Sequence, residues 1–130
     1  DNQQGAQRGP NIVFRYWMDG LVLLHLGDLG HMLDDNMAVA IGPVDVLFAP
    51  IGGKFTIDHR LASAIAEKLQ PRVFIPMHYK TPALHFDVDG LEPLLQANAK
   101  RSVHQLNANT CSLTRENLGD SRLLILDYKR

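Results

Sequence analysis

Several features that define specialised classes of protein are scarce in this sequence. Cys111 is the only cysteine, which excludes an intramolecular disulfide, and a lone thiol fits a reducing compartment. We therefore expect a cytoplasmic protein. The formal net charge is −1, from 13 basic and 14 acidic residues, which gives no electrostatic basis for binding nucleic acid or an anionic membrane surface. The longest apolar runs, such as 44–51, are far shorter than the roughly 18 residues that a membrane span needs.

What is present is the composition of a globular domain. Hydrophobic residues make up 45% of the chain and charged residues 21%, which is close to the average of folded proteins. With 130 residues, the chain has the size of one domain. No repeat, low-complexity stretch or internal linker divides it, so we expect a single domain over 1–130.

Hydrophobic patterning predicts strands that alternate with helices. Apolar runs rich in β-branched and aromatic residues indicate strands at 12–18, 21–26, 44–50, 73–77, 103–106 and 123–128. Helical spacing and capping residues indicate helices at 34–41, 57–69 and 89–98, with Thr56 as the N-cap of the second. Asp19-Gly20 is typical of a type I′ hairpin turn. The sequence thus predicts the α/β class, with a mixed sheet that is antiparallel at both ends.

Polar loops follow three of these strands, and two of these loops carry residues suited to metal chemistry. Asp28 and His78 each come just after an apolar strand, and sites in open α/β sheets form at the carboxyl ends of strands. A carboxylate and an imidazole suit a divalent metal such as zinc, which activates a bound water. The spacing contains no local double-ligand motif, so a turn-capping role for Asp28 and a buried, hydrogen-bonded role for His78 remain open.

The order of the motifs along the chain is more specific than any one of them. RGPN (8–11), GDLGH (27–31), GPVDVLFAPIGG (42–53) and KLQPRVFIPMHY (68–79) follow one another. This series resembles the metallo-β-lactamase-fold hydrolases of the lactonase-like branch over about residues 8–82. The resemblance implies an αββα sandwich with one or two metals between its sheets. It also implies hydrolysis of a lactone, ester, amide or phosphoester by metal-activated water.

The resemblance implies roles for individual residues. Asp28 matches the family's bridging carboxylate, and His78 matches its last metal-binding histidine. Gly52 and Gly53 match a loop near the site where the backbone approaches closely. Arg8 and Asn11 match a further segment of the family, which has a structural or substrate-orienting role.

Other candidates have both a functional and an ordinary interpretation. His31 is either a residue at the mouth of the site or an exposed loop histidine. Tyr79 either packs in the core or polarises a substrate carbonyl, and we favour packing or a supporting contact. His59, in the first turn of a predicted helix, is expected to be solvated. The aromatic cluster of Phe14, Tyr16 and Trp17 is expected to lie in the core or at an interface.

The sequence also departs from the family pattern. It has no His-x-His-x-Asp-His string, so it resembles only the second half of such an enzyme. Two ligands fall short of the about four donors that zinc requires, so we expect the chain alone to be inactive. Its sheet would expose an apolar face, which predicts a partner: the first half of the hydrolase or a second copy of the chain. Alternatives are a non-catalytic, self-associating remnant, or a site shared across a homodimer with two Asp28 and two His78.

Overall fold

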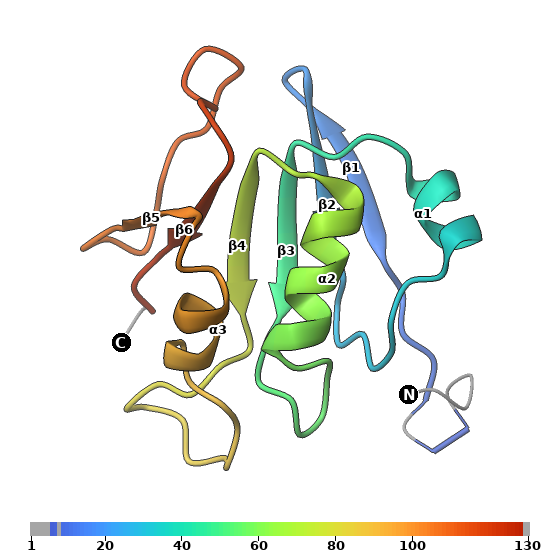
Figure 1. Cartoon of the computed structure of the whole chain (residues 1–130), viewed down its shortest axis with the longest axis vertical. Helices are drawn as coiled ribbons and strands as arrows, with labels where there is room; N and C mark the ends of the chain where they lie inside the picture. The colour runs from blue at the N-terminus through green and yellow to red at the C-terminus, as the bar shows by residue number, and fades with distance from the viewer. Residues whose placement is uncertain (1–5, 8, 129–130) are drawn as a thin grey trace.

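One mixed sheet organises the molecule. The computed structural model describes residues 6, 7 and 9–128, and within them six strands lie in the order β1-β2-β3-β4-β6-β5 (Figure 1). The strands are β1 (Phe14–Met18), β2 (Leu21–His25), β3 (Val46–Pro50), β4 (Val73–Met77), β5 (Ser102–Gln105) and β6 (Arg122–Ile125). The helices are α1 (Asp35–Ile41), α2 (His59–Leu69) and α3 (Glu92–Ala97). β1 is antiparallel to β2 and the other neighbouring pairs are parallel, which confirms the predicted α/β class with a mixed sheet.

The first two strands form the predicted hairpin. Asp19 and Gly20 have φ angles of 49° and 76°, and positive φ at both central residues is the mark of a type I′ turn. The twist of this turn matches the twist of the strands that it joins, so the pair forms without strain. The pairing sets Tyr16 opposite Leu23 and Phe14 opposite His25.

The C-terminal strands differ from the prediction. β5 and β6 are parallel, with Ser102 opposite Arg122 and Gln105 opposite Ile125, whereas the sequence pattern predicted antiparallel strands there. Parallel neighbours need a long crossover connection rather than a hairpin turn. Residues 106–121 provide that connection, and Leu113 and Leu118 on it pack against the sheet.

Helix α2 starts two residues later than predicted, and its cap is a different side chain. Asp58 is the N-cap, and its carboxylate accepts hydrogen bonds from the amides of Arg60 and Leu61. The predicted cap, Thr56, is instead buried, and its hydroxyl donates to the carbonyl of Ile57. A carboxylate at the N-cap also interacts favourably with the helix dipole, which makes Asp58 the better cap of the two.

The larger part of the core lies between the sheet and the helices. Figure 1 shows α2 and α3 on the same face of the sheet. Helix α2 turns Ala62, Ile65 and Ala66 towards Leu47 of β3 and Phe74 of β4, and all five side chains are fully buried in one cluster. No helix in the described part of the chain is long and apolar enough to cross a membrane.

The opposite face of the sheet carries none of the helices in the described part of the chain and is only partly covered. Its buried residues form a second, smaller cluster: Leu21, Val46, Val73, Ile75, Leu118 and Leu124. On the β1 side of this cluster, cross-strand pairing places Phe14, Tyr16 and Met18 on the same face, and all three are exposed. We call this side of the sheet the open face. It extends from Phe14, Tyr16 and Met18 to the half-buried Leu23 and Phe48.

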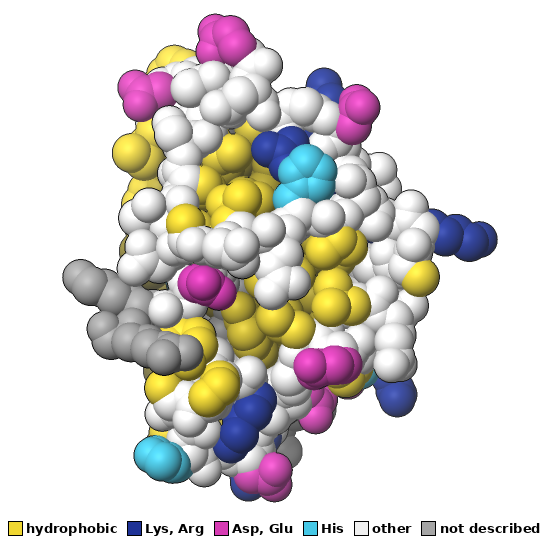
Figure 2. All heavy atoms as spheres, turned by 90° about the vertical axis from the view of Figure 1, so that its left-hand side faces the viewer, with side chains coloured by type: hydrophobic (Ala, Val, Ile, Leu, Met, Phe, Trp, Pro, Cys, Tyr) yellow, Lys and Arg dark blue, Asp and Glu magenta, His cyan; other side chains and the backbone are white. Residues whose placement is uncertain are grey.

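The open face continues into an apolar groove. The groove has a volume of about 400 Å³ and lies between the sheet and the crossover segment. Its lining includes Leu21, Leu23, Val46, Phe48, Ile75, Leu113 and the exposed Cys111. Figure 2, viewed from the side of β5 and β6, shows apolar side chains inside hollows between polar loops. The sheet therefore buries the centre of one face under the helices and leaves apolar surface uncovered on the other.

Candidate functional site

Three loops follow β2, β3 and β4 at the carboxyl edge of the sheet, and backbone hydrogen bonds join them into one layer. The amide of Ile57 donates to the carbonyl of Leu29 at 2.7 Å, which ties the second loop to the first. The amide of Asp89 donates to the carbonyl of Gly52 at 3.0 Å, which ties the third loop to the second. The residues predicted to carry the chemistry therefore stand on a connected backbone.

Asp28 is exposed, and its backbone is fixed by a side chain from the N-terminal segment. Asn11 donates from Nδ2 to the carbonyl of Leu26 at 2.9 Å and accepts from the amide of Asp28 at 2.8 Å through Oδ1. Gly27 permits this close approach, because a Cβ there would lie 2.5 Å from Asn11 Oδ1 and its φ is +60°. The carboxylate of Asp28 is thus presented to solvent on a backbone that Asn11 positions. A structural role for Asn11 agrees with this geometry, whereas contact with substrate stays a prediction.

His78 follows β4 and is also exposed, so its interpretation as a buried core histidine is wrong. Its backbone has a φ of 52°, which non-glycine residues rarely adopt and which is found at functional positions. Gly52 makes room for it, because a Cβ on Gly52 would lie 2.4 Å from the carbonyl oxygen of His78 and 3.4 Å from its Nδ1. Gly53, with a φ of +80°, turns the loop next to it. The roles of these residues towards a ligand remain predictions.

The remaining candidates have mostly structural contacts. His31 is half-buried, with its Nδ1 2.9 Å from the carbonyl oxygen of Met32. Tyr79 packs against the helix-side core and donates to the carbonyl of Leu126 at 3.4 Å. Burial, together with the charge of Asp127, raises the pKa of the Tyr79 phenol above its ordinary value. Arg8 lies outside the described residues.

Two features of this edge were not found from the sequence. Phe55 and Phe86, from the second and third loops, are exposed and meet edge-to-face with ring centres 5.9 Å apart. His59, which was expected to be solvated, is half-buried, and its Nδ1 is enclosed without a hydrogen-bond partner in the described structure. None of these three residues belongs to a local motif, and only the packing of the loops brings them to the edge.

The donor set at this edge falls short of the metal that the resemblance implies. Asp28 and His78 are of the right chemical types and are both exposed at the carboxyl edge. However, the described residues contain no group of three or more His, Cys, Asp or Glu side chains placed to hold a metal ion. Because zinc requires about four donors, the residues described here do not form a metal site by themselves.

Comparisons with known proteins give a consistent result. A family model described as a beta-lactamase superfamily domain matches residues 1–78. A UPF0173 metal-dependent hydrolase of Carboxydothermus hydrogenoformans is 44% identical over 70 residues, which cover 53% of this chain and 31% of that protein. The corresponding hydrolase of Pyrococcus furiosus is 40% identical over 85 residues, which cover 64% of this chain and 38% of that protein.

Solved structures share the fold. A protein of Thermotoga maritima, assigned as a Zn-dependent hydrolase of the metallo-beta-lactamase superfamily, superimposes with a TM-score of 0.82 at 36% identity. That match covers 91% of this chain and 59% of the Thermotoga chain. The metallo hydrolase Igni18 of Ignicoccus hospitalis has a TM-score of 0.53 at 27% identity, over 73% of this chain and 40% of its own. The chain spans well under half the length of the curated relatives that it matches, as the 31% and 38% coverage of the first two show.

Proposed function

Because this chain belongs to the beta-lactamase superfamily domain family, we propose that it supplies part of the active site of a metal-dependent hydrolase. In this proposal Asp28 and His78 provide two of the metal donors, and a second polypeptide segment provides the others. The metal, for which we propose zinc, would when bound activate water. The substrate class proposed is a small molecule with a lactone, ester, amide or phosphoester bond.

The observation that supports the proposal best is the arrangement of the carboxyl edge. Asp28 and His78 are exposed polar side chains, yet the loops that carry them are held by a network of hydrogen bonds. His78 also keeps a positive φ, which costs energy and persists only where the surroundings enforce it. Backbone that is held in a costly conformation in this way is expected where a side chain must keep one position at a functional site.

The open face supports the idea of a second segment. Phe14 is 47% exposed and Tyr16 46% exposed, and their rings stack 6.0 Å apart on the uncovered side of the sheet. Apolar surface of this kind on a sheet is stable when another sheet packs on it. We propose that the covering segment corresponds to the part of the relatives that this chain does not span, and that the same segment completes the donor set.

Co-expression tests the proposal. The chain is expressed with the part of the Thermotoga maritima hydrolase that it does not span, as two polypeptides and, in a second preparation, as one fused chain. The purified complex is expected to hold zinc and to hydrolyse p-nitrophenyl butyrate, a lactone or bis(p-nitrophenyl) phosphate. Asp28→Asn and His78→Gln should each lower the zinc content measured by mass spectrometry, whereas His104→Gln, on exposed β5, should leave it unchanged.

Two results of this experiment would contradict the proposal. A well-folded complex without metal would show that the shared donor set does not exist. Equal zinc content in the wild type, Asp28→Asn and His78→Gln would show that neither residue is a ligand.

One observation favours a second candidate function. The described residues lack a three-donor group while the open face is apolar, as expected of a non-catalytic domain that associates with a second copy of itself. This candidate requires a metal-free homodimer in native mass spectrometry. A dimer that carries metal and loses it with His78→Gln would instead support a site shared between two copies.

A further inference from the structure

His25 lies where the open face meets the carboxyl edge of the sheet. It is the last residue of β2, and it pairs with Phe14 of β1 and with Phe48 of β3. Paired residues of neighbouring strands share a face of the sheet, so the imidazole is on the open face beside these two aromatic rings. Asp28, a proposed metal donor, follows in the loop after β2. His25 is therefore a polar side chain at the corner where the covering segment and the proposed donor set would meet.

One hydrogen bond determines which nitrogen of this imidazole carries the proton. The amide of Gly27 donates to Nδ1 of His25 at 3.0 Å. A backbone amide can only donate, so Nδ1 offers a lone pair and the proton of the neutral ring is on Nε2. A metal ion at Nε2 would need the lone pair of that nitrogen and would place the proton on Nδ1, against the Gly27 amide. The geometry therefore makes His25 a hydrogen-bond donor and not a metal ligand.

The donor of His25 has a fixed direction and no partner. The ring stacks on Phe48, with ring centres 5.8 Å apart and 26° between the planes. Because Nδ1 is turned towards the backbone of Gly27, Nε2 is at the far side of the ring. Nε2 has no hydrogen-bond partner among the described residues, and it is not one of their enclosed polar atoms, so it faces solvent in the isolated chain.

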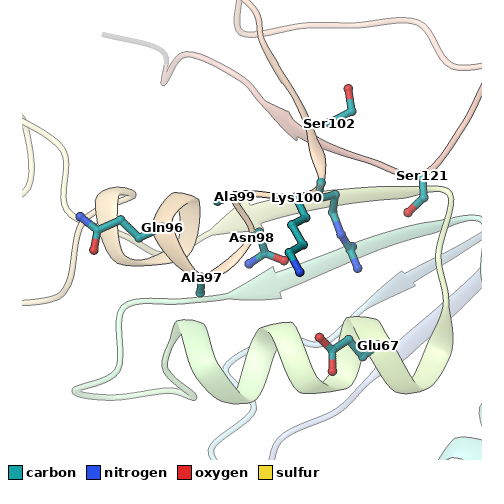
Figure 3. A pocket seen from close by; sticks show the side chains of 9 residues that line it. Glu67, Gln96, Ala97, Asn98, Ala99, Lys100, Ser102 and Ser121 are labelled. Atoms are coloured by element: carbon teal, nitrogen blue, oxygen red, sulfur yellow. The ribbon is translucent and has the colours of Figure 1, made fainter.

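The hollow between α2, α3 and the start of β5 has no comparable donor in its described lining (Figure 3). It has a volume of about 640 Å³ and carries charges of both signs, with Glu67 on the α2 wall and Lys100 opposite. Gln96 and Ser102 point away from Lys100. Polar groups that converge on one point give a site its specificity, and this hollow does not bring such groups together.

Covering the open face would enclose the Nε2 proton of His25 between Phe14 and Phe48. A polar group buried without a partner costs free energy, so a segment that packs here has to bring an acceptor. Amides, lysine and arginine cannot accept at their nitrogens. A carboxylate is disfavoured, because one neutral donor does not offset the burial of a charge.

We propose that the covering segment presents an uncharged oxygen, such as a backbone carbonyl, to Nε2 of His25. This hydrogen bond, in apolar surroundings, sets the register of the segment on the open face, as single polar contacts do in other apolar interfaces. The inference rests on the proposed function, which supplies the segment, and it names a contact through which that segment is positioned next to Asp28.

Side-chain NMR of the isotope-labelled chain tests the contact. The chain is observed alone and in the two-polypeptide complex with the part of the Thermotoga maritima hydrolase that it does not span. In the isolated chain, the nitrogen shifts of His25 should be those of the tautomer with its proton on Nε2. In the complex, this proton should exchange with water at least about tenfold more slowly, because an acceptor covers it.

His25→Asn separates the roles of the two nitrogens. The shorter side chain can still accept from the Gly27 amide, as in an Asx turn, but it does not reach as far as Nε2. Replacement of the variant in the purified complex by a fluorescent wild-type chain should be about tenfold faster than for the wild type, with zinc content unchanged. His104→Asn, the same change on exposed β5 at the far edge of the sheet, should alter neither.

The outcomes distinguish this inference from the proposed function. A zinc-loaded complex in which His25→Asn is replaced at the wild-type rate would overturn the inference alone, and so would a proton on Nδ1 in the isolated chain. Loss of zinc in His25→Asn would make His25 a ligand, and a raised KM for p-nitrophenyl butyrate with unchanged replacement would assign Nε2 to the substrate; either overturns the contact with the segment. Failure of the wild type to form any complex would overturn the proposed function and this inference together.

Discussion

Asn11 connects the N-terminal segment to the loop that carries Asp28. Its single side chain satisfies one backbone acceptor, at Leu26, and one backbone donor, at Asp28. Both bonds span a long stretch of sequence, so their loss frees the loop without disturbing any helix or strand. At this position a polar side chain from a distant segment, and not the hydrophobic core, fixes the backbone of the candidate metal ligand Asp28.

We expect Asn11→Ala to lower the free energy of unfolding by about 1–3 kcal/mol, because a backbone donor and acceptor lose their partners. Amide hydrogen exchange at Asp28 should become faster. Urea denaturation and exchange measured by NMR check both effects. Asn107→Ala, at an exposed loop position, is the matched control and should change neither. Unchanged exchange at Asp28 in Asn11→Ala would show that the loop is held by other contacts.

Gly52 and Gly90 form a natural comparison. A Cβ on Gly52 would lie 2.4 Å from the backbone oxygen of His78, whereas a Cβ on Gly90 would meet only Oε2 at the flexible end of Glu92, at 2.6 Å. Gly52→Ala should therefore destabilise the chain by about 1–3 kcal/mol, as overpacking does, and should shift the His78 signals in NMR spectra. Gly90→Ala should be nearly neutral. Equal effects of the two substitutions would show that the loop can move away from His78 without cost.

Tyr79 predicts a change of stability at alkaline pH. Its pKa in the folded chain is raised above the ordinary value of 10.0, so the folded state retains the proton more tightly than the unfolded state does. The stabilisation is complete below pH 10.0 and is lost as the pH rises towards the higher, folded pKa. Tyr79→Phe should remove this pH dependence at a cost of about 0.5–1.5 kcal/mol at neutral pH. Urea denaturation from pH 8 to 11 and absorbance titration of the phenolate would check it, and an unchanged pH profile in the variant would contradict it.

At the scale of elements, α2 depends on its first turn. Asp58→Ala should cost about 0.5–2 kcal/mol, because two amides lose their acceptor and the helix dipole loses a negative charge. Asp58→Asn keeps the acceptor oxygen and should cost clearly less. Thermal and urea unfolding followed by circular dichroism would check the order. Equal destabilisation by Asp58→Ala and Asp58→Asn would show that the negative charge of Asp58 stabilises α2 and that its hydrogen bonds to the amides of Arg60 and Leu61 do not.

Elements with a strong local signal were predicted well from the sequence, and those determined by distant contacts were not. The span of β4, the Asp19-Gly20 turn and the end of α2 at Leu69 agree with the structure, because alternation, turn residues and helix periodicity act within a few residues. The cap of α2 was placed wrongly because Thr56 and Asp58 both have capping side chains, and only burial of Thr56 separates them.

Contacts between loops were beyond the reach of the sequence for the same physical reason. Asp28 and His78 could be placed at strand ends from local pattern alone. The bond from Asn11, the fit of Gly52 against His78 and the Phe55–Phe86 pair all join segments that are far apart in the chain. The parallel pairing of β5 with β6 depends likewise on the path of the long crossover, which no turn signal encodes.

The whole molecule has a carboxyl edge with polar side chains and one uncovered face of the sheet. The carboxyl edge presents the carboxylate of Asp28 and the imidazole of His78. The strands pack one face against α2 and α3 and leave the open face only partly covered.

The open face predicts how the chain behaves in isolation. Exposed apolar side chains on Phe14, Tyr16 and Met18 favour association with a second copy, because burial of apolar area releases about 25 cal/mol per Å². Sedimentation analysis should therefore show concentration-dependent dimers, and Tyr16→Lys, which puts a charge in the centre of this face, should shift the chain to monomer. Arg15→Lys, at the neighbouring position that points to the other side of the strand, is the control. In the co-expressed complex, Tyr16→Lys should weaken binding of the covering segment as well, since both partners would use the same face. A chain that stays monomeric at all concentrations, and whose complex tolerates Tyr16→Lys, would show that the open face is not an interface.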